Sequence, residues 1–171
     1  MKKQLHFTDE GLVLKKSSLR DNDRRVVLLT RNFGKKTLTA FGVRKITSRR
    51  LSHLETGSVI RLSWREDGDF AVLEETELRF AHSRIKESKD LLTLMYDLLY
   101  IVHRLLPDSE PAPAVYALTL KYLRKIYTQG LSHDEFGDYV SKLLVLEGFA
   151  SHEEVKKRSF DPFKFTESLL N

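Results

Sequence analysis

The residues with the clearest chemical potential are the basic ones between Lys15 and Arg50. This stretch holds twelve lysines and arginines but only two acidic residues, a net charge of +10 in a chain whose total is +5. Apolar residues alternate with the charges, which indicates a folded β surface, because a disordered basic tail has nothing to bury. Such a surface attracts phosphates. The residues expected to contact nucleic acid are Arg24, Arg31, Lys35, Lys36, Phe41, Arg44, Lys45, Arg49 and Arg50.

Aromatic rings would supply the second element of single-strand binding, because a base can stack on any exposed ring. Phe33 lies at a predicted hairpin tip, and Phe41 shares one strand face with Thr37 and Thr39, so both rings are candidates for stacking. Trp64 has the same parity as the apolar residues of its strand, which favours a place in the core.

Each of these features also has a plainer interpretation. The basic stretch could be a solvated sheet face, although its clustering favours nucleic acid. The pair Asp23 and Arg24 fits either a capped turn with a local ion pair or a direct DNA contact. A second basic group on a predicted helix could extend the DNA surface or face water, and we expect water; it consists of Lys121, Arg124 and Lys125.

Little in the sequence indicates catalysis or metal binding. The chain has no cysteine, which removes disulfides, thiolate nucleophiles and cysteine-based zinc sites. Its six histidines are scattered without a partner histidine at helical spacing, so we expect no metal ion and no other cofactor. No Walker-type glycine-rich loop and no nucleophile–base pair is visible. We therefore expect a protein that is not an enzyme.

The elements that must position the basic stretch are predicted strands separated by turn residues. Turn chemistry at Asn32-Phe33-Gly34 and at Asp67-Gly68 predicts two hairpins. A short helix is expected after the third strand. Three strands, a helix and two strands are typical of an OB-fold barrel, so the expected fold class is α+β. The expected strands are 11–16, 25–31, 35–41, 59–65 and 70–78, and the expected short helix is 48–54.

The second half of the sequence predicts helices. Residues 88–106 are apolar around nearly the whole circumference, which indicates a buried central helix. An amphipathic helix is expected over 114–129, and serine–glutamate spacings at Ser132 and Ser151 predict two more helix starts. The expected domains are an OB-fold nucleic-acid-binding domain at 1–80 and a small α-helical bundle at 81–171.

Charge and hydropathy set the expected location. Residues 1–80 carry a net charge of +6 and residues 81–171 a net charge of −1, which indicates a basic binding module joined to a neutral one. No signal peptide is visible at the N-terminus. The apolar segment Leu91–Val102 is too short to span a bilayer. We therefore expect a cytoplasmic protein, with no membrane as a partner.

Spaced motifs in the first half resemble the N-terminal module of the RecO recombination-mediator family. The motifs are Gly11-Leu12-Val13-Leu14-Lys15, Asp23-Arg24 followed by Leu28-Leu29-Thr30-Arg31, Gly34, Gly42-Val43-Arg44-Lys45 and Ser48-Arg49. They cover roughly residues 8–80 in register, and the second half is more loosely similar to the family's helical domain. The chain differs from typical members in being short, in having Asp21 where glutamate is common, in lacking a proline near Thr56, and in lacking a four-cysteine zinc site.

The resemblance implies a function and a set of partners. An OB-fold of this family would bind single- and double-stranded DNA, promote strand annealing, cooperate with RecR, and help to load the recombinase RecA onto DNA covered by single-strand-binding protein. It also implies an association with the nucleoid. A groove beside the Leu91–Leu106 helix, flanked by Lys121 or Lys125, would bind the acidic, phenylalanine-ended tail of single-strand-binding protein. The alternative is a recruitment module of a repair complex with only incidental DNA contact.

Overall fold

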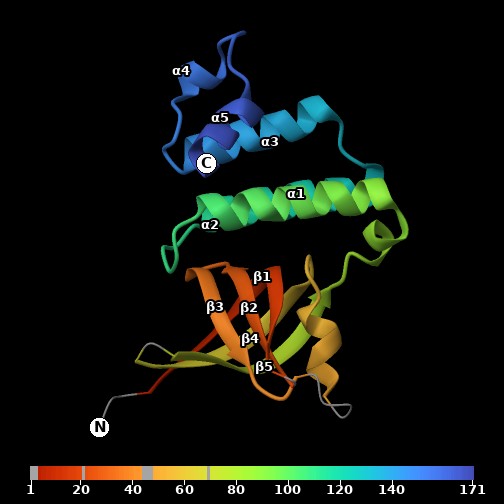
Figure 1. The fold of residues 1–171 in the computed structure, drawn as a ribbon, viewed down its shortest axis with the longest axis vertical. Coiled ribbons are helices and arrows are strands. Elements are labelled where there is room, and N and C mark those ends of the chain that lie inside the picture. Colours follow the sequence, from red (N-terminus) through yellow and green to blue (C-terminus); the bar gives the residue numbers. More distant parts are fainter. Residues whose placement is uncertain (1–3, 21, 44–47, 69) are drawn as a thin grey trace. The chain divides into compact units, whose positions relative to one another are not determined.

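The computed structural model describes residues 4–20, 22–43, 48–68 and 70–171, which form two compact units (Figure 1). The first unit contains residues 1–83 together with residues 107–116, and the second contains residues 84–106 and 117–171. The units are therefore interleaved along the chain. The two expected domains, divided at residue 80, stay a prediction.

Five strands of the first unit close into a barrel in the order β1-β2-β3-β5-β4 (Figure 1). Neighbouring strands are antiparallel except for β3 and β5, which run parallel and meet at the pair Thr39 and Val72. The prediction of five strands with a short helix after the third is confirmed. The elements are β1 (Leu5–Arg20), β2 (Asp23–Thr30), β3 (Gly34–Ala40), the 3-10 helix η1 (Arg49–Leu54), β4 (Val59–Asp67), β5 (Phe70–Phe80) and a second 3-10 helix η2 (Ser83–Glu87).

The first strand is much longer than the predicted strand over 11–16. Its first half pairs with β4, and its second half pairs with β2 as far as Arg20. Ser17 and Ser18, which lie beyond the predicted strand, are opposite Arg25 and Arg24 within the ladder. The hydrogen bonds of a two-partner strand outweigh the local preference of serine for turns.

The barrel core is built from alternate residues of all five strands. Trp64 is fully buried in it, so the prediction that this ring belongs to the core is confirmed. Phe33 packs edge-on against Trp64 and Phe7, with ring centroids 5.3 Å apart in both pairs. The turn thus folds this partly buried ring back over the barrel end, and base stacking on it stays a prediction.

Residues 107–116 pack as a strap against the turn between β2 and β3. The backbone N–H of Ser109 donates to the carbonyl of Lys35 at 2.9 Å, and Lys35 Nζ lies 3.1 Å from Asp108 Oδ1. Gly34 has a φ of 70°, and a Cβ at this position would lie 1.9 Å from the carbonyl oxygen of Glu110. Only glycine therefore fits beneath the strap.

The far end of the strap is anchored on β1. The Tyr116 hydroxyl donates to Glu10 Oε1 at 2.9 Å, and burial together with this bond raises the pKa of Tyr116 above its usual range. The neighbouring Asp9 accepts hydrogen bonds of 2.8 Å from both the backbone and the side chain of Asn32. The hairpin turn and the strap are thus tied to the same stretch of β1.

The second unit consists of helices whose starts the sequence encodes locally. Ser88 caps the first long helix, and complete capping boxes join Ser132 to Glu135 and Ser151 to Glu154, as predicted. The last helix was not predicted, although Asp161 as its N-cap and a proline in its first turn are the usual signals. The helices are α1 (Lys89–Leu105), α2 (Pro113–Gln129), whose residues 113–116 belong to the first unit, α3 (His133–Leu146), α4 (His152–Val155) and α5 (Pro162–Leu170).

Helix α1 is not buried on all sides, so the interpretation of 88–106 as a wholly buried helix was wrong. Tyr96 and Tyr100 are 49% and 53% exposed, and together with Thr93 and Asp97 they form an exposed stripe along the helix. Met95 and Leu98 lie on the opposite, buried face. Among the described residues, none of the helices is both long and apolar enough to cross a membrane.

Candidate nucleic-acid interface

A groove of about 540 Å³ lies on the outer surface of the barrel, where the strand ends β1, β2, β3 and β5 meet. Its lining combines two phenylalanine rings, two threonines and one guanidinium with one carboxylate and two aliphatic side chains. The lining residues are Leu19, Asp23, Arg25, Thr37, Thr39, Phe41, Phe70 and Ala71.

Strand parity places these side chains. On β3 the residues Leu38 and Ala40 are buried in the core, so Thr37 and Thr39 must project outward. This confirms the predicted face that Phe41 shares with the two threonines. The sequence pattern of β3 alone was sufficient for this part of the site.

The backbone on either side of Phe41 is anchored. Asp23 Oδ1 accepts from the N–H of Gly42 at 2.8 Å, which ties the end of β3 to the start of β2. Arg50 donates to the carbonyls of Phe41 at 2.9 Å and of Glu74 at 3.0 Å. Phe41 is 52% exposed, although hydrogen bonds hold its backbone from two sides.

Phe70 is the functional candidate that sequence reasoning missed. It begins β5 directly after the turn that starts at Asp67, and it is 74% exposed. An aromatic residue immediately after a predicted Asp-Gly hairpin turn was the available signal, since turns present their flanking side chains at the surface.

Three of the expected DNA-contacting cations instead pair with carboxylates from distant parts of the sequence. Arg24 Nη1 lies 3.7 Å from Glu55 Oε1, and Lys36 Nζ lies 3.0 Å from Glu66 Oε1. Lys35, whose side chain is 10% exposed, pairs with Asp108 of the strap. These ion pairs lower the net field of the basic stretch, because their carboxylates come from outside it.

Of the other residues expected to contact DNA, some are described by the structure and some are not. Arg31 is exposed, whereas Arg50 is engaged with backbone carbonyls as described above. Arg44 and Lys45 lie outside the described residues, and only the backbone of Arg49 is described. Arg25, which was not among the expected contacts, is exposed at the groove. The assignment of individual DNA contacts stays a prediction.

The pair Asp23 and Arg24 has structural partners on both sides. Asp23 accepts from Gly42, and Arg24 approaches Glu55, which also accepts from Lys16 Nζ at 2.5 Å. These contacts agree with the capped-turn interpretation of the pair. They tie β1 and the start of β2 to Glu55, which directly follows η1.

Glu66 joins the barrel end to its core. Burial acts to raise the pKa of this carboxyl, but hydrogen bonds from Trp64 Nε1 at 3.0 Å and from Lys36 at 3.0 Å outweigh it, so the pKa of Glu66 is lowered. The Lys36 ammonium is therefore part of the barrel's own polar network.

A second, smaller groove of about 490 Å³ lies between α2 and α3 in the helical unit. Lys121 and Arg124 are exposed at its rim, and the Tyr122 ring is buried. The groove was expected beside α1, flanked by Lys121 or Lys125; both lysines line this groove between α2 and α3 instead, and the binding of a partner tail stays a prediction. Its lining is Lys121, Tyr122, Arg124, Lys125, Thr128, Asp138 and Lys142.

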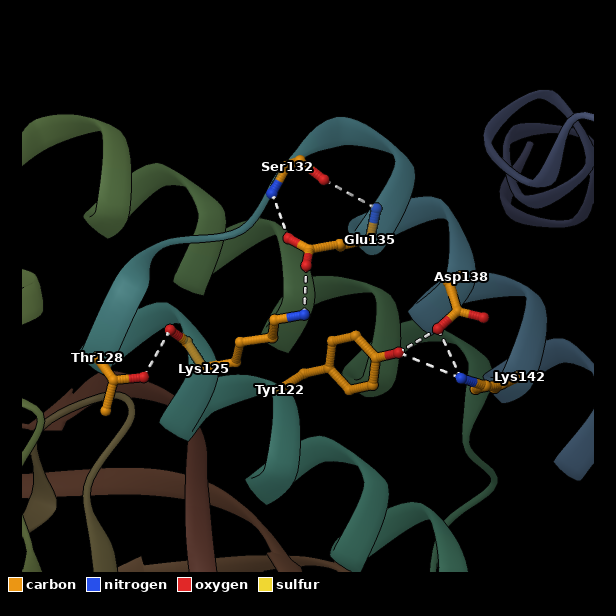
Figure 2. A network of polar contacts seen from close by, with 7 residues as sticks. All are labelled: Tyr122, Lys125, Thr128, Ser132, Glu135, Asp138 and Lys142. Carbon is orange, nitrogen blue, oxygen red and sulfur yellow. Dashed lines mark hydrogen bonds and ion pairs between the residues drawn. The ribbon is translucent and has the colours of Figure 1, made fainter.

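Polar contacts fix the walls of this second groove (Figure 2). Lys142 donates to Asp138 at 2.5 Å, and the Tyr122 hydroxyl donates to the same carboxylate. Burial acts to raise the pKa of Asp138, yet the bonds from Lys142 and Tyr122 lower it overall, and the bond to Asp138 raises the pKa of Lys142. Lys125 pairs with Glu135 of the capping box, so its charge is already compensated.

Two further kinds of site, metal sites and a larger groove of the helical unit, remain to be described. Within the part of the chain that the structure describes, no group of three or more histidine, aspartate or glutamate side chains could hold a metal ion. The larger groove, of about 1050 Å³, lies between α3 and residues 152–164 and has mixed apolar and charged walls. It contains none of the residues expected to contact DNA.

A five-stranded barrel with a short helix after its third strand has the architecture of an OB-fold, and here one groove of that barrel presents exposed rings, hydroxyls and a guanidinium. Residues 1–81 match the family described as recombination protein O N terminal. Over 121 residues the chain is 31% identical to the DNA repair protein RecO of Myxococcus xanthus, covering 70% of this chain and 50% of that protein. Over 143 residues it is 30% identical to the DNA repair protein RecO of Syntrophus aciditrophicus, and the match covers 82% of this chain and 55% of that protein.

A third relative, the DNA repair protein RecO of Desulforudis audaxviator, is 25% identical over 147 residues, which cover 84% of this chain and 57% of that protein. The chain is a member of the RecO family. It spans about half the length of the curated relatives that it matches.

Proposed function

We propose that this protein is a DNA-binding recombination mediator of DNA repair. Its barrel is an OB-fold domain that binds single- and double-stranded DNA, and it promotes annealing of complementary strands without catalysing a chemical step. The single observation that carries the proposal is the barrel groove, in which two exposed rings and Arg25 lie on a module that matches the RecO N-terminal family.

The position of the groove supports the assignment. OB-folds bind oligonucleotides across the face of their second and third strands, flanked by the loops between strands one and two and between strands four and five. Arg25 on β2 and Thr37 on β3 occupy that face, and Leu19 and Phe70 lie beside those two loops. The groove therefore coincides with the surface that this type of barrel uses.

The partners follow from the family. As a mediator, the protein would cooperate with RecR and help to load RecA onto DNA covered by single-strand-binding protein. The groove between α2 and α3 supports binding of that protein's acidic, phenylalanine-ended tail, because Lys121 and Arg124 offer cations at the rim of a pocket above the Tyr122 ring.

A tail peptide tests this partner directly. Titration calorimetry should show binding of the peptide at micromolar concentration and its loss in Lys121→Glu/Arg124→Glu. The variant Lys89→Glu/Lys156→Glu changes the same charge at exposed positions outside this groove and should bind normally. No heat from the wild-type protein at high micromolar peptide would rule out this partner.

A fluorescent single-stranded oligonucleotide tests the DNA-binding proposal. Its affinity should fall steeply between about 50 mM and about 200 mM salt, because phosphate contacts release counterions. Annealing of two complementary labelled strands should accelerate in proportion to protein bound. If the oligonucleotide binds only weakly and without salt dependence while the tail peptide binds well, the protein is the alternative recruitment module.

A further inference from the structure

We propose that Phe41 and Phe70 form a base-stacking site that makes the barrel groove select unpaired strands over duplex DNA. The inference rests on the proposed function, and it assigns the groove's ligand class. Both rings line the same groove, although one follows β3 and the other begins β5. Their exposed fractions, 52% and 74%, are the largest among the exposed phenylalanines of the described residues.

The exposure of these rings is not a by-product of a loose backbone. Two hydrogen bonds anchor the peptide groups around Phe41, one from Arg50 and one to Asp23. Phe70 pairs with Asp67 in the ladder between β4 and β5. By contrast, the exposed hairpin position of Phe33 did not keep its ring in water, because it folds over Trp64. The barrel thus holds two rings in solvent on fixed backbone, as a stacking platform requires.

The remainder of the lining favours bases over phosphates. Thr37 and Thr39 offer hydroxyls, which can donate to or accept from base edges. Among the described residues that line the groove, Arg25 is the one cation, and Asp23 offsets its charge while accepting from Gly42. The described lining is therefore nearly neutral.

Stacking on exposed rings distinguishes unpaired strands from duplex DNA. The faces of bases in a duplex are covered by neighbouring base pairs, whereas an unpaired base can stack on any exposed ring. Proposed phosphate contacts elsewhere on the barrel can be made to single strands and to duplexes, because both carry a phosphate backbone. The two rings should therefore set the preference for single strands over duplex DNA, whereas the cations should set the salt dependence of binding.

The test compares Phe41→Ala and Phe70→Ala with Phe149→Ala, which removes a phenylalanine that is 40% exposed in the helical unit. Each groove variant should lose about 5- to 160-fold in affinity for a single-stranded oligonucleotide, the range for loss of one stacked base. Affinity for a blunt duplex and the salt slope should change little, and Phe149→Ala should match the wild type. Phe70→Tyr should restore single-strand affinity, because it restores the ring.

The outcomes separate this inference from the proposed function. If both groove variants keep single-strand affinity, or lose single-strand and duplex affinity equally, the stacking site is refuted while DNA binding stands. If the wild-type protein binds neither form of DNA, the proposed function itself fails. Unchanged melting temperatures, expected for exposed side chains, ensure that lost affinity reflects the groove.

Discussion

Replacement of Gly34 by alanine tests the close packing of the strap on the barrel. The φ of 70° lies in the left-handed region, where an L-residue costs about 1–2 kcal/mol. In addition, the new Cβ would lie 1.9 Å from the Glu110 carbonyl oxygen, so the strap must move. That movement would break the bond from Ser109 to Lys35, a further loss of about 1 kcal/mol. We expect a total destabilisation of about 2–3 kcal/mol.

Gly148→Ala is the matched control, because Gly148 has a φ of 73° but no atom lies within 4 Å of the position that a Cβ would take. It should cost only about 1–2 kcal/mol, the backbone contribution alone. Urea unfolding of Gly34→Ala can be followed through the fluorescence of Trp64, the single tryptophan, and that of Gly148→Ala through helical circular dichroism. Equal losses in the two variants would refute the close approach of the strap.

Two further predictions concern the polar networks. Ser132→Ala should destabilise the helical unit by about 1 kcal/mol in thermal unfolding, because the Ser132 hydroxyl no longer accepts the hydrogen bond from the Glu135 backbone N–H. Full stability after this change would show that the cap is dispensable. The lowered pKa of Glu66 contributes stability above the ordinary glutamate pKa that disappears as the pH falls through the folded value. Lys36→Met should therefore weaken the fall of melting temperature between about pH 7 and about pH 3, and an unchanged profile would exclude this linkage.

Much of the fold could be predicted because its determinants are local. Alternation on β3 separates Leu38 from Thr37 and Thr39, and the capping box at Ser132 marks where α3 begins. The last helix, which was not predicted, has an equally local signal in Asp161 followed by proline.

The electrostatics of the site could not be predicted in the same way. The stretch from Lys15 to Arg50 itself contains two acidic residues, but the fold brings Glu55, Glu66 and Asp108 to that surface. Likewise, the strap over Lys35 comes from residues more than seventy positions away, which no local pattern encodes. Long-range pairing therefore decides which cations of this stretch are paired with carboxylates within the fold.

The role of the aromatic residues required the structure for a similar reason. Phe33 and Phe70 both lie beside predicted hairpin turns, yet one ring packs on Trp64 and the other is mostly exposed. The difference depends on which side of the barrel each turn presents its ring. That is set by strand register, which the sequence leaves open until all five strands are paired.

The salt dependence of single-strand binding tests the central claim most directly. The variant Arg44→Ala/Lys45→Ala/Arg49→Ala removes three of the phosphate contacts predicted from the sequence. Its control, Lys156→Ala/Lys157→Ala/Arg158→Ala, removes the same charge from three exposed residues of the helical unit. With about 0.7 per phosphate for single strands, the barrel variant should flatten the slope of log K against log salt by about 2, and the control should leave it unchanged. An unchanged slope in the barrel variant, with its melting temperature intact, would contradict DNA binding by the barrel.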